Sequence, residues 1–593
     1  MSAPRVIVIG GGVAGLTVAH ELADRGFAVS VHEARPDFGG KARSQPVPGT
    51  GTNGRRDLPG EHGFRFYPRF YRHVTDQMAR IPVGERTVAD FLRPTTEAAI
   101  ALIDDDTWYR FSRKRLTTPY SVLETIEIFF QNLDFDAQDV AVFGAKLLQF
   151  ATASDARRLA EYEQISWYEF LAAEHASEKF QIQLRGIPRM MVAMDSTRGS
   201  ARTIGVITLQ LLRDFAFNGM QNDRTLGGPT SQIWIDPWLA HLRGKGVELY
   251  GGSPAAGLDV EGGRIAGVRL SGGERVTGDF YVLAVPLEAA IALISPELGA
   301  LDPQLELLRG QTPETLVSWM CGIQYFLYED VPLVRGHLFF PDSPWALTAV
   351  SQPQFWRDLG VFRRLYGDGS VGGLLSVDIS EWDTPGKLIP KPAKECSRQE
   401  IADEVWWQLK AALNGAAEGD TILTDDILHS WHLDDDLDLD PGVAPPMNSS
   451  RLLVHPPGSW SLRPEAASRI PNLAIAGDYV RTHTNIASME SACEAGRRAT
   501  NVVLERTGSA ARRADVWPLE EPSFRAFKWL DHQLFISGRP HLFELLGIRH
   551  AVRAATVIRR VERILGLAKI DDWADQYKLT TIVKVILARF GVR

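Results

Sequence analysis

The chain has 593 residues, of which 45% are hydrophobic and 23% charged, and its formal net charge is −9. These shares are typical of a soluble globular enzyme, and the acidic balance argues against a nucleic-acid partner. Because the length exceeds one ordinary hydrophobic core, we expect two intertwined domains and an appendage.

The cysteines and the hydropathy pattern indicate the cellular compartment of the protein. Cys321, Cys396 and Cys493 have neither the spacing of a metal site nor the number for a disulfide scaffold. We therefore predict no metal site and a reducing, cytoplasmic location. No uncharged run reaches the roughly 20 residues of a spanning helix. The first strand begins at Arg5, so we expect no signal peptide before it.

The chain opens with a pattern typical of nucleotide binding. A β-branched run at residues 5–9 predicts a strand, and residues 16–24 predict a helix. Between them stand Gly10, Gly12 and Gly15, in Gly-x-Gly-x-x-Gly spacing. Such glycines serve, in order, a tight turn, close approach of backbone to a pyrophosphate, and close helix–strand packing.

The next residues complete a βαβ unit. Ala14 stands at the helix start, where unpaired amides face phosphates. Residues 28–32 predict a second strand, which ends in Glu33 at the spacing of an acid that binds a ribose. A glycine-rich turn without a ligand is the alternative, but the order of these elements favours a nucleotide.

A second glycine pair, Gly39 and Gly40, follows soon after Glu33. A flavoprotein uses such a pair to bring backbone amides to the FAD phosphates, and either Lys41 or Arg43 can neutralise them. The alternative is a plain turn with two solvated cations.

This pattern of acid, spacer and Gly-Gly-Lys resembles the flavoprotein family that holds phytoene and ζ-carotene desaturases, hydroxysqualene dehydroxylases and monoamine oxidases. Lys41 is nearer the carotenoid side of the family, because Arg is usual in amine oxidases. The resemblance extends over residues 5–505. It implies an α/β fold: a Rossmann-type, amine-oxidase-like FAD-binding domain, an interleaved α+β substrate domain and a C-terminal helical extension. FAD is expected to bind non-covalently, since Cys493 is not in the setting of covalent attachment.

The expected domains are discontinuous. The predicted ranges are 1–85, 225–300 and 455–510 for FAD binding, 86–224 and 301–454 for the substrate domain, and 511–593 for the extension.

The segment 61–71 is expected to return the chain to the flavin, with Gly63 and Phe64 at the cofactor. Arg65 stands where the resembling desaturases usually have His. It either orients an oxygen-bearing group and steadies reduced flavin, or it caps a loop through backbone carbonyls. Tyr67 is a further candidate catalytic residue, as is His483.

Residues 87–217 predict a mainly helical cap over the active site. The expected helices cover residues 121–130, 137–151 and 165–174. Within the cap, Met190, Met191 and Met194 either line an apolar channel or fill the core.

Alternating and apolar runs then predict strands. They are residues 246–250, a hairpin over 258–270 that turns at Gly262 and Gly263, and a buried strand from 280. The resemblance places Ala256 beside the adenine.

A second excursion follows, in which residues 318–326 and 336–340 predict strands of a substrate-domain sheet. Their aromatic residues suit a flat, conjugated substrate, although aromatic strands also fill cores.

The last cofactor element is a strand at 472–476 followed by Gly477, Asp478 and a helix that starts near Ala487. The resemblance puts Asp478 at the ribityl-phosphate side of FAD and this helix start, with Met489, under the flavin's pyrimidine edge. A helix N-terminus stabilises the negative charge of reduced flavin there.

Residues 548–565 carry an apolar stripe surrounded by arginines. A helix of this kind either lies on anionic lipid, giving a peripheral membrane contact through residues 548–570, or packs on its own protein or a partner. The sequence leaves the oligomeric state open.

The leading functional hypothesis is hydride transfer between flavin N5 and a large apolar polyene, with NADPH considered as electron donor. Segments 61–67 and 343–348 resemble long bacterial phytoene dehydrogenase-like enzymes. The specific form is redox-triggered ring formation on a polyene tetramate, as in polycyclic tetramate macrolactam pathways, where Arg65 would grip an acidic oxygen. Alternatives are a carotenoid desaturase or hydroxysqualene dehydroxylase, a flavin amine oxidase, and a non-enzymatic flavin scaffold.

Overall fold

The structure, a computed structural model, describes residues 3–104, 108–112, 136–218, 223–414, 421–439, 445–521 and 524–546. The helix predicted at 121–130 and the segment 548–570 lie outside these ranges. None of the helices within them has both the length and the apolar character needed to cross a bilayer.

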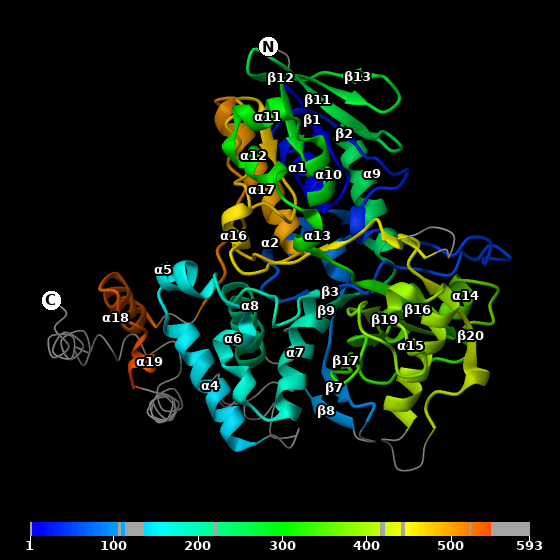
Figure 1. Cartoon of the computed structure of the whole chain (residues 1–593). Coiled ribbons are helices and arrows are strands. Elements are labelled where there is room, and N and C mark those ends of the chain that lie inside the picture. Colours follow the sequence, from blue (N-terminus) through cyan, green and yellow to red (C-terminus); the bar gives the residue numbers. More distant parts are fainter. Residues whose placement is uncertain are drawn as a thin grey trace.

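The nucleotide domain is built on a five-stranded parallel sheet (Figure 1). Its strands come from distant parts of the chain, and the predicted strands at both ends of the chain take part in it. The inner strands are buried, because helices and a further sheet cover them. In sheet order the strands are β10 (Glu248–Tyr250), β2 (Ala28–His32), β1 (Arg5–Ile9), β14 (Phe280–Leu283) and β24 (Leu473–Ile475).

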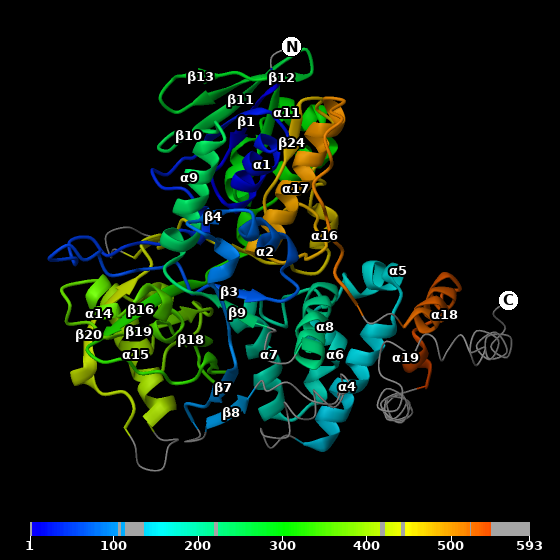
Figure 2. The ribbon, with the colours of Figure 1, turned by 180° about the vertical axis from the view of Figure 1, so that it is seen from behind.

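Two helices from opposite ends of the chain pack on each other beside this sheet (Figure 2). They are α1 (Val13–Ala23) and α17 (Met489–Arg506). Helix α1 begins three residues earlier than predicted, because Gly12 already serves as its N-cap. Gly496 permits the close contact, since a Cβ there would lie 2.7 Å from the carbonyl oxygen of Ala14.

The predicted hairpin is confirmed as β11 (Ala255–Glu261) and β12 (Arg264–Leu270), which pair antiparallel. Gly262 and Gly263 form its turn with φ of 58° and 74°, a left-handed conformation that glycine adopts without strain. A short strand β13 (Arg275–Val276) extends this sheet at its edge.

The second domain is organised around a mixed seven-stranded sheet that lies below the nucleotide domain in Figure 1. Helix α15 (Arg398–Asn414) packs on it, and the Tyr325 hydroxyl donates to the Ala402 carbonyl at 2.7 Å. In sheet order the strands are β20 (Leu428–Leu433), β16 (Cys321–Leu327), β19 (Gly373–Ile379), β18 (Leu347–Ser351), β17 (Gly336–Phe339), β7 (Glu97–Ala101) and β8 (Trp108–Ser112).

The prediction that the chain becomes mainly helical from residue 87 is wrong. Residues 97–101 form β7, which pairs parallel with β17 and antiparallel with β8. The sequence Glu-Ala-Ala-Ile-Ala has low strand propensity and no alternation, so pairing on both sides, with β8 and with a strand some 240 residues later in the chain, makes it extended. Both excursions of the chain therefore share one sheet.

Helices do follow β8. The helix α4 (Ala137–Thr152) agrees with the prediction within one residue. The helix α6 (Trp167–Leu171) is shorter than predicted, because Ala172 takes a φ of 52° and ends it. Two longer helices, α7 (Glu178–Val192) and α8 (Ala201–Asn218), complete the cap.

The described start of the C-terminal extension packs on this cap. In α18 (Arg525–Ile536), buried Asp531 accepts a hydrogen bond from Arg157 Nε at 2.8 Å. A buried charge pair of this kind fixes the helix against the cap.

Candidate active site

A cavity of about 390 Å³ lies at the carboxyl ends of β1, β2, β14 and β24, between the two domains. Open parallel sheets bind ligands at this edge. Of the residues predicted to hold the cofactor, its wall includes Gly10, Gly12, Ala14, Glu33, Gly39, Gly40, Lys41, Phe64, Gly477, Asp478, Ala487 and Met489.

The first glycine turn has the geometry that the fingerprint requires. Gly10 has a φ of 104°, and a Cβ on Gly15 would lie 1.9 Å from the Gly10 carbonyl oxygen. A Cβ on Gly12, in contrast, would meet only the Cα of Gly40, at 3.7 Å. The start of α1 therefore opens to the cavity, as anion binding at a helix N-terminus needs.

Glu33 is held at the cavity edge by backbone amides. Its Oε2 accepts from Gly11 N at 2.6 Å and its Oε1 from Arg35 N at 3.0 Å. Each carboxylate oxygen has a further lone pair, so Glu33 can still accept hydroxyl hydrogen bonds from a ribose.

The second glycine pair packs directly on the first turn. Gly39 N donates to the Gly11 carbonyl at 2.9 Å, and a Cβ on Gly40 would lie 3.1 Å from the Cα of Gly12. The φ angles of Gly39 and Gly40 are 107° and 58°. Two adjacent turns of backbone amides thus face one side of the cavity, which suits a pyrophosphate.

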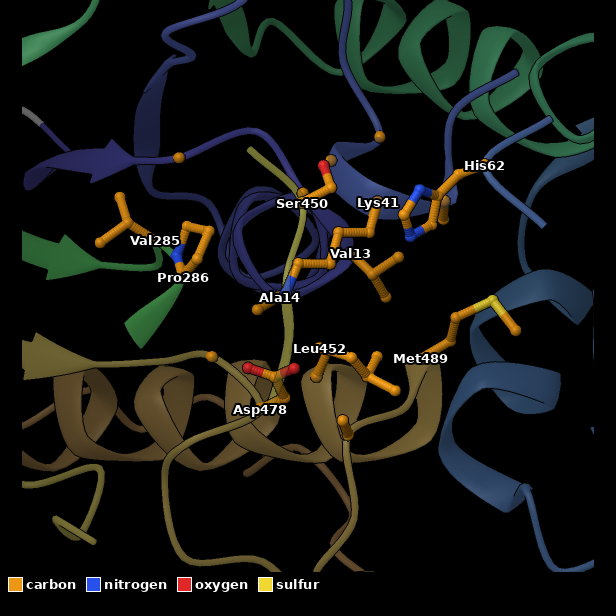
Figure 3. A pocket seen from close by; sticks show the side chains of 18 of the residues that line it. Val13, Ala14, Lys41, His62, Val285, Pro286, Ser450, Leu452, Asp478 and Met489 are labelled. Carbon is orange, nitrogen blue, oxygen red and sulfur yellow. The ribbon is translucent and has the colours of Figure 1, made fainter. Parts of the chain in front are cut away.

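Lys41 and Arg43 have separate partners. Lys41 lines the cavity beside Ala14, and its Nζ donates to the Arg451 carbonyl (Figure 3). Arg43 is directed elsewhere, to an ion pair of 2.7 Å with Asp436. Lys41 is therefore the one of the two placed to reach a phosphate in the cavity.

The opposite wall is formed by Asp478 and the start of α17 (Figure 3). Ser488 caps this helix, with its side chain accepting from Ser491 N at 3.1 Å. Met489 at the first helical position lines the cavity. Gly-rich turns, a ribose-binding acid and two helix starts around one cavity fit FAD.

Other predicted residues do not line this cavity. Gly63 packs beneath it and Ala256 stands next to Ala255, which does line it. Tyr67, in β3 (Phe66–Pro68), is buried with its ring edge against Trp234. His483 is exposed, and its backbone amide donates to Glu494. The structure thus keeps Tyr67 and His483 apart from the cavity.

The part of the cavity wall that includes residues of the seven-stranded sheet combines aromatic and methionine side chains with a few polar ones. Phe64 and Phe66 contact the His337 ring, at centroid distances of 4.8 and 4.6 Å. Met190 and Met320 also belong to this part. Met194 instead packs in the core, and the side chain of Met191 lies outside the description. A wall with aromatic side chains suits a large apolar substrate.

Arg65 makes the predicted contact with a backbone carbonyl and also stands in the cavity wall. It lines the cavity, and its Nη2 donates to the Lys41 carbonyl at 2.8 Å. Its Nη2 also lies 3.8 Å from Glu61, a buried carboxyl whose pKa burial raises. Its Nε has no hydrogen-bond partner among the described residues.

His62, Asp434 and Asp436 lie as close together as metal ligands do. However, His62 Nδ1 pairs with Asp434 at 2.5 Å, and Arg43 and Arg35 pair with Asp436. Although burial acts to raise the pKa of Asp434, its pairing with His62 keeps that pKa below the usual value. The carboxylates are already neutralised, so the cluster fits an ion-pair network that orders the second glycine turn.

Asp378, in the inner strand β19 of the seven-stranded sheet, was not identified from the sequence. It is buried, lines the cavity, and its Oδ1 lacks a hydrogen-bond partner in the described part of the chain. Burial raises its pKa to about 7. The sequence feature that could have identified Asp378 is a single carboxylate within a mainly apolar strand.

Fold and site together define a Rossmann-type flavoprotein in which a second, mixed sheet closes the cavity. Residues 13–504 match the family described as flavin containing amine oxidoreductase, and the chain belongs to this family. It is an FAD-dependent oxidoreductase.

Several proteins are similar over most of their length. The chain is 25% identical to the carotenoid phi-ring synthase of Streptomyces griseus, over 85% of this chain and 89% of the relative. It is 22% identical to the 15-cis-phytoene desaturase of Synechococcus elongatus, over 87% of this chain and 99% of the relative. Cyclohexylamine oxidase from Brevibacterium oxydans has the same fold, with a TM-score of 0.57 at 15% identity over 85% of this chain and 100% of that one.

Proposed function

We propose that this enzyme transfers hydride between FAD and a long, apolar polyene that carries an acidic oxygen. The specific form is redox-triggered ring closure on a polyene tetramate. When bound, the flavin supplies the two-electron chemistry, and the protein supplies orientation and dryness.

The observation that carries the proposal is the placement of polar groups in the aromatic part of the cavity wall. Arg65 and Asp378 stand in the cavity wall beside Phe64 and Phe66, and their Nε and Oδ1 atoms are buried without protein partners among the described residues. A pure hydrocarbon would leave both groups unpaired, which is costly for buried atoms. A substrate with an ionised oxygen would pair with the permanently charged guanidinium.

A hydrocarbon or hydroxylated isoprenoid is the second candidate. The names of the similar proteins, a carotenoid phi-ring synthase and a phytoene desaturase, favour it. In that case the aromatic wall would still bind the polyene, and Arg65 would serve mainly to hold the Lys41 carbonyl.

Turnover of a substrate panel by the purified flavin-loaded enzyme tests the proposal. Polyene tetramates, phytoene, hydroxysqualene and simple amines are each supplied with NADPH under nitrogen, or with oxygen alone. We expect conversion of the tetramate, read by mass spectrometry and flavin absorbance. Conversion of phytoene or hydroxysqualene with tetramates unchanged selects the second candidate, and hydrogen peroxide from amines indicates an amine oxidase.

A further inference from the structure

Asp378 is an acidic group that is almost fully buried in the cavity wall. Every residue of β19 is buried, and the Asp378 side chain reaches the cavity end that Phe64, Arg65 and His337 also line. Its Oδ1 has no hydrogen-bond partner among the described residues. A buried carboxyl without a full set of partners is costly, so a purely structural role does not explain it.

The surrounding backbone makes room for this carboxyl. In the sheet, Asp378 is opposite Gly322, and the loop that contains Gly63 crosses the same place. A Cβ on Gly63 would lie 2.7 Å from Asp378 Oδ1, and one on Gly322 would lie 2.8 Å from the Gly63 Cα. Two glycines thus let the carboxyl and the loop share a space too small for any side chain.

The charged groups that face Asp378 oppose one another. Arg65 and the Phe64 amide favour the ionised carboxylate, whereas Asp434, which is paired with His62, disfavours it. Burial is the largest influence and gives Asp378 a pKa of about 7. The group can therefore hold a proton at neutral pH and also release it, as a general acid or base requires.

We propose that Asp378 is the residue that exchanges a proton with the substrate in the flavin-dependent reaction, a role that rests on the proposed function. In the reducing direction the carboxyl O–H bond breaks and its proton bonds to one substrate atom. The substrate's other atom would gain the hydride that bound, NADPH-reduced flavin supplies, so one C=C double bond becomes a C–C single bond and two new C–H bonds form. The resulting carboxylate regains a proton from solvent after product release. In the oxidising direction the carboxylate takes the proton and oxidised flavin accepts the hydride.

The test compares the flavin-loaded wild type with Asp378→Asn, which keeps the side-chain volume and cannot supply the proton. Ser376→Ala is the matched control, because Ser376 is buried on the same face of β19 but does not line the cavity. Flavin absorbance follows single turnover with a polyene from pH 5 to 9. We expect Asp378→Asn to lower the rate about 100-fold or more at pH 6 and to remove the pH dependence near neutrality, with FAD affinity unchanged.

A readout independent of turnover is the infrared carboxyl band of the holoenzyme. We expect a protonated-carboxyl signal that disappears on titration through neutral pH, shifts on ¹³C labelling of aspartate and is missing in Asp378→Asn. If the variant does not fold, the wild type alone still tests the proposal, because the absence of any such aspartate signal rejects it. The absence of the signal overturns the proposal, since a carboxyl that stays ionised across neutral pH neither donates a proton nor binds one tightly enough for the proposed exchange.

The outcomes separate the two proposals. If the wild type converts a polyene while Asp378→Asn matches its rate and pH profile, the role of Asp378 is rejected and the proposed function stands. If the wild type converts none of the polyenes, the proposed function fails and the role of Asp378 fails with it.

Discussion

Gly63 and Asp378 approach so closely that a Cβ on Gly63 would lie 2.7 Å from the carboxyl oxygen Oδ1. One residue belongs to the loop that reaches the cofactor side, and the other to the inner strand β19 of the substrate-domain sheet. The contact therefore joins the cofactor side of the cavity to the substrate-domain sheet.

Gly63→Ala should displace this carboxyl or the loop beside it. We expect a loss of about 1–3 kcal/mol in the free energy of unfolding, which is typical of an overpacked site, together with reduced turnover. Thermal and urea unfolding of the holoenzyme measure the loss. Gly272→Ala is the control, because a Cβ there meets no atom within 4 Å. Equal stability of both variants would contradict the close contact.

Asp378→Asn should make the free energy of unfolding less dependent on pH. Burial raises the pKa of Asp378 to about 7, whereas an unfolded Asp titrates near 4. In this window the folded chain binds more protons than the unfolded chain, so the wild type loses up to about 1.4 kcal/mol of stability per pH unit as pH rises. Above pH 7 the loss is complete.

Urea unfolding at pH 5 and pH 8 checks this sign. The stability of Asp378→Asn relative to wild type should increase by about 2–3 kcal/mol between the two pH values. Ser376→Ala, on the same strand, should follow the wild type. A constant difference between Asp378→Asn and wild type would mean that the carboxyl is ionised throughout.

The parts of the site that could be predicted from the sequence are those whose residues lie close to one another along the chain. Gly10, Gly12 and Glu33 fall within one βαβ unit, so their spacing alone brings them to one sheet edge. The same holds for Asp478 and Met489, where a strand and the following helix face the cavity.

The missed parts depend on contacts between distant segments. The partner of His62 is Asp434, 372 residues away, and Arg43 pairs with Asp436 rather than facing the cavity. Asp378 stands in a strand whose neighbours are apolar, so neither period nor motif distinguishes it. Residues 97–101 became a strand by pairing with β8 and with the distant β17. In each case tertiary pairing overrides a local pattern.

Lys41→Gln should weaken FAD binding. Lys41, next to the second glycine pair, lines the cavity. A charge-assisted hydrogen bond to phosphate contributes about 1.5–3 kcal/mol, which corresponds to roughly a 10- to 150-fold change in Kd. Titration of the apoprotein with FAD, followed by flavin fluorescence, gives this constant. Lys179→Gln, at an exposed position of α7, should bind FAD as the wild type does. Unchanged affinity in Lys41→Gln would place the phosphates elsewhere.

Arg65→Gln should discriminate between oxygenated and hydrocarbon substrates. Arg65 lines the cavity, and its Nε has no hydrogen-bond partner within the described part of the chain. Loss of a charge-assisted bond to an ionised oxygen should raise KM about 10- to 100-fold. A hydrocarbon polyene of equal length makes no such bond, so its KM should change little. Steady-state kinetics with both substrates measure the two effects, and Arg264→Gln on the exposed edge of β12 is the control. If KM rose equally for both substrates, Arg65 would act by holding the Lys41 carbonyl and the shape of the second glycine turn. That outcome would favour a hydrocarbon substrate.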